Sequence, residues 1–165
     1  MSRLIILRGN SGSGKTSLAK LLQRRLGRGA MRISHDMVRM EILNIKAPGD
    51  LPLLMEMLRY GHAHAGTTVL EGILGSDAYA PLFQLAKALY GEEIFAYYYD
   101  LPFEETLRRH ASKPNRDDFG EEDMRRWWRE RDLLADIKEK VFGPEISLTA
   151  AEEQVLSDLE GRKLP

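Results

Sequence analysis

The chain has 165 residues, of which 30% are charged, and its formal net charge is −1. This length suits one domain with a buried core, so we expect a single domain over residues 1–165. The near-neutral charge provides no general attraction for nucleic acid or an anionic membrane. The chain contains no cysteine, which excludes disulfides, thiolate zinc sites and a cysteine nucleophile, and fits a cytoplasmic protein.

Short apolar runs typical of strands alternate with segments of helical period. In chain order, we predict a strand at 3–7, a helix at 15–26, a strand at 30–33 and helices at 37–43 and 50–65. A strand at 67–71, a helix at 77–90, a strand at 94–99 and helices at 104–110 and 121–134 follow. A fifth strand at 145–148 precedes a last helix, which Thr149 and Glu152 would cap. This alternation predicts an α/β fold, in which helices cover both faces of a parallel sheet. No run approaches the ~18 apolar residues of a membrane span, and we expect no signal peptide.

Residues 9–16 read Gly-Asn-Ser-Gly-Ser-Gly-Lys-Thr, which is the Gly-x-x-x-x-Gly-Lys-Thr pattern of a phosphate-binding loop. The glycines let the backbone curl with its N–H groups inward, and the next helix directs its positive end at the same anion. We expect Lys15 to reach the β and γ phosphates of a nucleotide and Thr16 to bind Mg²⁺. The residues expected to bind the nucleotide are Ser11, Gly12, Ser13, Gly14, Lys15, Thr16 and Ser17. A Gly/Ser turn that only caps a helix is the alternative.

Acidic residues follow three of the other predicted strands, where open parallel sheets bind their ligands. Asp36 is a candidate base that would accept a proton from a substrate hydroxyl, or else a helix cap. Glu71 would support Mg²⁺ or contact the phosphate acceptor. Asp100 competes with Glu71 for the metal, although Pro102 favours a cap. Arg39 would hold an anionic substrate group, or it is a solvated surface arginine.

A basic segment over residues 108–131 is a predicted lid, named the lid segment below. Phosphoryl transfer depends on positioning and charge stabilisation, which cations on a closing segment supply. The candidates are Arg109, Lys113 and Arg116 as catalytic residues and Arg125 as a substrate contact. For Arg126, Arg129 and Arg131 we prefer a solvated helix face that acidic neighbours balance. Trp127 and Trp128 are interpreted as packing residues.

Together, the phosphate loop, the segment 33–39 and the run from Asp100 to Lys113 resemble small P-loop kinases of the polynucleotide kinase and zeta toxin type. Chloramphenicol phosphotransferase and bacterial proteins described as uridine kinase-like are also similar. The resemblance implies a three-layer P-loop NTPase fold with a five-stranded parallel sheet and a helical lid. It also implies ATP, Mg²⁺ and transfer to a hydroxyl. In the polynucleotide kinase pattern, Asp36 would be the base, Arg39 would contact the substrate phosphate, and the two lid arginines fall on Arg109 and Lys113, where lysine replaces arginine.

These observations predict an ATP-dependent kinase for a small hydroxyl-bearing metabolite, with nucleosides and nucleotide sugars as candidate acceptors. A 5′-hydroxyl polynucleotide kinase is an alternative, although the neutral charge gives little affinity for a nucleic-acid backbone. A zeta-toxin-like kinase is another. From a different class, the chain would be a nucleotide-gated binding module that phosphorylates nothing. The residues do not identify the acceptor or the oligomeric state.

Overall fold

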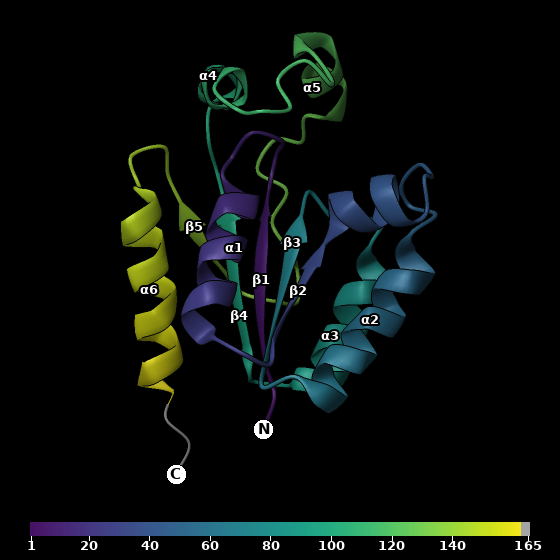
Figure 1. Cartoon of the computed structure of the whole chain (residues 1–165), viewed down its shortest axis with the longest axis vertical. Coiled ribbons are helices and arrows are strands. Elements are labelled where there is room, and N and C mark those ends of the chain that lie inside the picture. The colour runs from purple at the N-terminus through teal and green to yellow at the C-terminus, as the bar shows by residue number, and fades with distance from the viewer. Residues whose placement is uncertain (163–165) are drawn as a thin grey trace.

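Five parallel strands form the centre of the molecule, in the order β2-β3-β1-β4-β5 (Figure 1). The structure is a computed structural model that describes residues 1–162. The strands are β1 (Arg3–Gly9), β2 (Ala30–Ser34), β3 (Thr67–Gly72), β4 (Ile94–Tyr99) and β5 (Glu139–Phe142). The helices are α1 (Lys15–Leu26), the π-helix η1 (Met37–Ile42), α2 (Leu51–His64), α3 (Ala80–Tyr90), α4 (Phe103–Ala111), α5 (Glu121–Trp127) and α6 (Leu148–Gly161).

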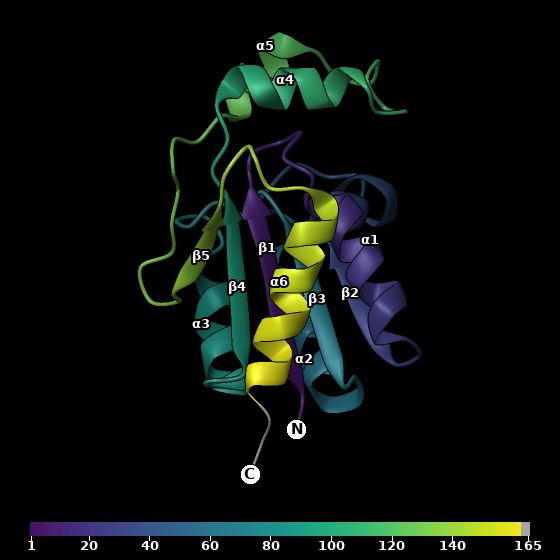
Figure 2. The same cartoon turned by 90° about the vertical axis from the view of Figure 1, so that its left-hand side faces the viewer.

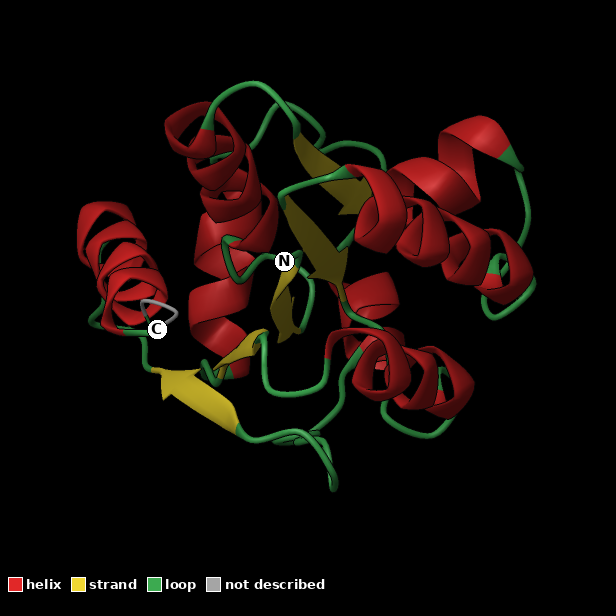
Figure 3. Ribbon diagram, turned by 90° about the horizontal axis from the view of Figure 1, so that it is seen from below, coloured by secondary structure: helices red, strands yellow, loops and turns green. Residues whose placement is uncertain are grey.

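Helices cover both faces of the sheet, so the molecule has three layers (Figures 1 and 3). Successive residues of β1 point to opposite faces: Ile5 packs in the core that α1 and α6 cover, and Ile6 packs in the core beneath α2 and α3. Both residues are fully buried, as expected for a strand in the middle of a parallel sheet. The predicted α/β fold with a five-stranded parallel sheet is therefore confirmed.

All five strands end at the same edge of the sheet, because they are parallel. The phosphate loop leaves β1 at this edge and enters α1. Helices α4 and α5 lie across the same edge, while the start of β1 and the end of α6 lie at the opposite end of the molecule (Figures 1 and 2). In the described part of the chain, no helix is both long and apolar enough to cross a bilayer.

Two predicted elements near the C-terminus were misplaced. The fifth strand is Glu139–Phe142 rather than 145–148, and the side chain of Ser147, not Thr149, caps α6 by accepting from the Ala150 N–H at 3.0 Å. The sequence Glu-Lys-Val-Phe lacks the apolar pattern of a strand. It lies at the edge of the sheet, and its first residue, Glu139, pairs with the buried Arg8 of β1. The hydrophobicity of neighbouring residues does not reveal a partner so distant in the sequence.

Two helices are also shorter than predicted. The helix expected over 121–134 ends at Trp127, and the chain up to β5 has no regular structure. Its backbone is instead bound to the phosphate loop and the sheet through side chains, described below. The helix expected to begin after Ser76 or Asp77 begins at Ala80, and the Asp77 carboxylate accepts at 2.7 Å from the N–H of Ala78, two residues before the helix.

Candidate active site

The phosphate loop takes a conformation that requires its glycines. Gly12 and Gly14 have φ angles of 81° and 102°, which side-chain-bearing residues rarely adopt. Space also restricts Gly12, because a Cβ there would lie 2.5 Å from the carbonyl oxygen of Thr106 in α4. Helix α4 therefore packs directly on the loop, at a point where any side chain would separate the two.

Lys15 is buried at the start of α1, and its ammonium group turns back into the loop. The Nζ atom donates to the Asn10 carbonyl oxygen at 2.8 Å and to Ser13 Oγ at 3.1 Å. Burial lowers the pKa of Lys15 to about 8, although the negative charges of Glu71 and Asp36 oppose this shift. The site thus holds a desolvated cation that an anion would stabilise in its charged form.

Glu71 and Thr16 bring two oxygen donors together beside Lys15. Glu71 is the next-to-last residue of β3, beside β1, and is 2% exposed, and its Oε1 accepts from the Thr16 hydroxyl at 3.1 Å. Arg32 of β2 approaches the same carboxylate, with 3.8 Å between Nη1 and Oε1. A hydroxyl and a carboxylate oxygen suit Mg²⁺, which proteins bind through few side chains together with water and substrate phosphates. The described residues contain no group of three or more His, Cys, Asp or Glu side chains that would form an all-protein metal site.

Asp36 lies just beyond β2, with its side chain 63% exposed. Its carboxylate makes no capping hydrogen bond, and its φ and ψ of −63° and −42° are already helical, whereas a capping residue needs an extended backbone. The cap interpretation of Asp36 is therefore wrong. The nearest cation is Arg39, whose Nη2 lies 3.6 Å from Asp36 Oδ1.

The cap interpretation of Asp100 is also wrong. Pro102 occupies the N-cap position of α4, and Asp100 Oδ2 accepts from Arg131 Nη1 at 2.7 Å. Arg131 is thus paired with the end of β4 rather than with acidic neighbours on a helix. Among the other two arginines of that group, Arg126 pairs with Asp123 on α5 as expected, and Arg129 binds Asp77 as well as Asp132.

The lid segment brings one of its predicted cations, Arg109, into contact with the phosphate loop. Arg109 donates from Nη1 to the Ser13 carbonyl oxygen at 2.8 Å, and Glu105 holds its Nε at 2.9 Å. Lys113 is partly buried, and burial lowers its pKa while the charges of Asp36 and Glu71 oppose the shift. The same two carboxylates oppose the pKa shift of Lys15.

The other two predicted lid residues are placed differently. Arg116 is exposed in the turn between α4 and α5, and its carbonyl oxygen lies 3.2 Å from His110 Nε2. Arg125 pairs with Glu121 at 2.8 Å, and its guanidinium lies 4.3 Å from the centre of the Phe103 ring. Arg125 therefore stabilises the lid itself, because its position on α5 directs it to neighbours within the lid.

A buried polar cluster behind Asp36 was not predicted. His35 Nε2 lies 2.8 Å from the Tyr79 hydroxyl and 3.0 Å from Asp50 Oδ2, and the Tyr79 hydroxyl donates to Asp50 Oδ1 at 2.7 Å. Burial lowers the pKa of His35, which favours the neutral ring. The cluster joins the end of β2 to the starts of α2 and α3. Its three members are far apart in the sequence, so no local pattern could have indicated it.

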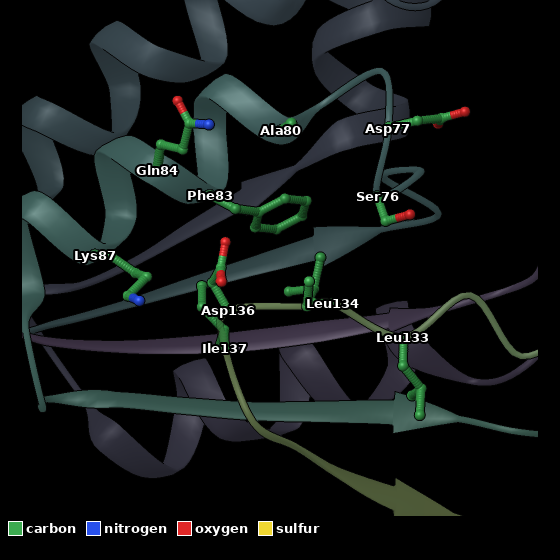
Figure 4. A pocket seen from close by; sticks show the side chains of 11 residues that line it. Ser76, Asp77, Ala80, Phe83, Gln84, Lys87, Leu133, Leu134, Asp136 and Ile137 are labelled. Atoms are coloured by element: carbon green, nitrogen blue, oxygen red, sulfur yellow. The ribbon is translucent and has the colours of Figure 1, made fainter.

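The buried Arg8 of β1 was missed as well. Its side chain is fully buried and binds Asp132, Glu139 and the Leu74 carbonyl oxygen. The only signal in the sequence is an arginine at the end of the apolar run of β1. A separate cavity of about 230 Å³ lies between α3 and residues 133–137, away from the phosphate loop, and Phe83 and Leu134 line it (Figure 4).

The chain is similar over nearly its whole length to solved structures of small kinases. It matches a gluconokinase from Sinorhizobium meliloti with a TM-score of 0.65 and 15% identity, covering 96% of this chain and 92% of that one. It matches the APS kinase of Mycobacterium tuberculosis, solved with AMPPNP and APS, with a TM-score of 0.63, 18% identity and 96% of each chain covered. The chain has the fold of the P-loop kinases. Shikimate kinase from Aquifex aeolicus is also similar, with a TM-score of 0.54, 21% identity and 96% of each chain covered.

The sequence matches no model of a protein family and no curated protein. At identities of 15 to 21%, the structural similarity establishes the fold and not the substrate. The part of the resemblance that named small P-loop kinases agrees with these neighbours. These neighbours do not test its finer part, the resemblance to polynucleotide kinase and zeta toxin.

Proposed function

We propose that the protein is an ATP-dependent kinase that transfers the γ-phosphoryl group to a hydroxyl of a small metabolite. One observation supports this most directly. A phosphate loop with a buried lysine lies beside a Thr16–Glu71 pair, and Asp36 and the lid cations approach the same edge of the sheet. The kinases of similar structure act on small molecules according to their names, which favours the same class of acceptor.

The phosphate loop would bind the nucleotide through its backbone N–H groups and Lys15. The loop spans Ser11, Gly12, Ser13, Gly14, Lys15, Thr16 and Ser17. The Lys15 ammonium would exchange its contacts with the Asn10 carbonyl oxygen and Ser13 Oγ for phosphate oxygens. Thr16 and Glu71 would hold Mg²⁺, directly or through water, and the bound ion would neutralise charge on the phosphates.

Asp36 would act as the general base. Its exposed carboxylate would accept the proton of the acceptor hydroxyl while that oxygen forms a bond to the γ phosphorus. The bond between the γ phosphorus and the bridging oxygen would break, and ADP would leave with the bonding electrons. Charge on the transferred group would be stabilised by Arg109 and Lys113 from the lid, with Arg116 able to join from the exposed turn.

Arg39 would orient an anionic group of the acceptor or of the transferred phosphoryl group, since it lies beside Asp36 on η1. We leave Arg125 outside this proposed site because its contacts lie within the lid. The acceptor itself stays open within the class of small hydroxyl-bearing molecules, with nucleosides and nucleotide sugars as the first to test.

Labelled ATP and a metabolite pool provide the test. The wild-type protein is expected to label a product, and Asp36→Asn is expected to lower the rate by about 10²- to 10⁴-fold, the usual contribution of a general base. Glu153→Gln is the matched control, because it removes an exposed carboxylate of α6, and it should label the product at the wild-type rate. Equal labelling by Asp36→Asn would remove Asp36 as the base. No labelling with any pool, despite ATP binding, would favour the nucleotide-gated binding module.

A further inference from the structure

The lid returns to the sheet through a stretch without regular structure. Residues 128–138, named the connecting segment here, join α5 to β5 and run down the side of the molecule beside β5 (Figure 2). Such a stretch fixes a lid only where specific contacts hold it. Its contacts therefore decide how firmly the lid is held over the phosphate loop.

Asn10 of the phosphate loop makes the first of these contacts. Its Nδ2 donates to the Arg129 carbonyl oxygen at 2.7 Å, and its Oδ1 accepts from the Arg129 N–H at 2.9 Å. One carboxamide thus satisfies both backbone groups of a single residue 119 positions away. Asn10 is 7% exposed, so water cannot readily replace these bonds. A hydroxyl, a carboxylate or an apolar side chain cannot make both bonds with this geometry.

The same residue also contacts the nucleotide-binding lysine. The Asn10 carbonyl oxygen accepts from Lys15 Nζ at 2.8 Å. Asn10 therefore lies between the group expected to bind phosphates and the backbone that ends the lid. In a phosphate loop the backbone N–H groups bind the anion. If the residue after Gly9 served only to let the loop curl, its side chain would not need an amide.

We propose that Asn10 is a positioning residue that anchors the lid to the phosphate loop through the backbone of Arg129. The inference rests on the proposed kinase function for its catalytic consequence, but the anchoring itself does not. With the anchor in place, Arg109 and Lys113 are held over the loop. Without it, α5 and the turn before it detach more often, and the cations spend less time near the phosphates.

A second set of contacts, made by Asp132, should limit how far the loss of the Asn10 contacts loosens the chain. Further along the connecting segment, Asp132 accepts from Arg8 Nη2 at 2.9 Å and from the Ser76 hydroxyl at 2.6 Å. The Asp132 N–H donates to the Tyr98 hydroxyl at 2.9 Å. Loss of the Asn10 contacts should therefore loosen the chain before Asp132 and leave β5 and the sheet intact.

Hydrogen exchange without nucleotide tests the anchor directly. In Asn10→Ala and Asn10→Asp, amides of residues 112–131 are expected to exchange about 5- to 30-fold faster, the factor for one or two lost hydrogen bonds. Asn10→Asp keeps an oxygen that can accept from the Arg129 N–H, but it replaces the Nδ2 donor with a charged oxygen that faces the Arg129 carbonyl oxygen. This variant should therefore not restore protection. Asn115→Ala removes an exposed carboxamide within the lid segment and should leave the protection of residues 128–131 unchanged.

Tryptophan fluorescence offers a second readout. The only two tryptophans, Trp127 and Trp128, directly precede Arg129, and Trp128 Nε1 donates to Glu130 at 3.0 Å. Both Asn10 variants are expected to shift the emission without nucleotide, whereas Asn115→Ala is not. If activity is present, kcat should fall about 5- to 30-fold while the affinity for a nonhydrolysable ATP analogue changes less.

Three outcomes would overturn the anchor. Unchanged exchange and emission with weaker nucleotide binding would make Asn10 a nucleotide contact. Faster exchange throughout β1 and β4 would make it a residue for general stability. Full protection in Asn10→Asp would mean that the donor is not needed. Because exchange and emission are measured without ATP, these results stand apart from failure of the kinase proposal, which would appear as an inactive wild-type protein with a normal anchor.

Discussion

One buried charged cluster lies in the phosphate loop and another begins at Arg8, just before it in the sequence, and their partners differ in kind. Around Lys15 and Glu71, the contacts are a loop carbonyl and two hydroxyls, with Arg32 at 3.8 Å. Around Arg8, the contacts are two carboxylates, with the nearest atoms 2.8 and 2.9 Å apart, and the Leu74 carbonyl oxygen at 3.1 Å. In the first cluster the hydrogen bonds join charges to neutral groups and the ion pair is long, whereas in the second two close ion pairs hold the arginine.

This difference distinguishes the two clusters. The cluster of Lys15 and Glu71 is suited to bind an anion and a cation, whereas the Arg8 cluster holds the chain together. A buried lysine whose partners are neutral keeps a depressed pKa and gains when a phosphate arrives. A buried arginine matched by two carboxylates has little to gain from a ligand and much to lose from a mutation. The same degree of burial therefore marks a functional residue in one cluster and a structural residue in the other.

Breaking the Arg8 cluster should have the largest effect on stability. Arg8→Met leaves the buried Glu139 carboxylate without its cation and Asp132 with Arg129 alone, and we expect the free energy of unfolding to fall by about 3–5 kcal/mol. Unfolding in urea measures this change. The control is Arg131→Ala, which removes a 57% exposed partner of Asp100 and should cost about 1 kcal/mol or less. Equal losses in the two variants would contradict the assignment of Arg8 as a structural residue.

Removing the charge of Glu71 should affect activity more than stability. Glu71→Gln keeps an oxygen that can accept from the Thr16 hydroxyl but loses the negative charge proposed to stabilise Mg²⁺. We expect kcat to fall about 10²-fold and the Mg²⁺ concentration for half-maximal rate to rise. Rates measured across a Mg²⁺ titration test this. An unchanged Mg²⁺ dependence with lower kcat would assign Glu71 to the acceptor instead.

The pH dependence of nucleotide affinity should give the smallest effect. The pKa of Lys15 is lowered from 10.5 to about 8, so above pH 8 the free protein increasingly holds a neutral amine. A bound triphosphate favours the charged amine, so binding should take up a proton and the affinity should fall by up to about tenfold per pH unit above 8. Calorimetry in two buffers of different ionisation enthalpy measures the uptake.

The same shift fixes the sign of a stability change in the nucleotide-free protein. Between pH 8 and 10.5 the unfolded chain holds the Lys15 proton and the folded chain releases it, so this group makes folding more favourable as the pH rises. Lys20→Met removes an exposed lysine of α1 and should leave both pH profiles unchanged. Nucleotide binding without proton uptake at pH 8.5 would show that Lys15 stays charged in the free protein.

Four of the five strands, the phosphate loop and the positions of Asp36 and Glu71 near strand ends could be predicted from the sequence. These depend on short-range patterns: apolar runs that fit strands, glycines that fit positive φ, and acidic residues just beyond the strand ends. The end of α5, the position of β5 and the partners of Arg8, Asn10 and His35 could be seen only in the folded structure. Each of these depends on contacts between distant residues, and a side chain such as Asn10 has no periodicity that would show what it binds.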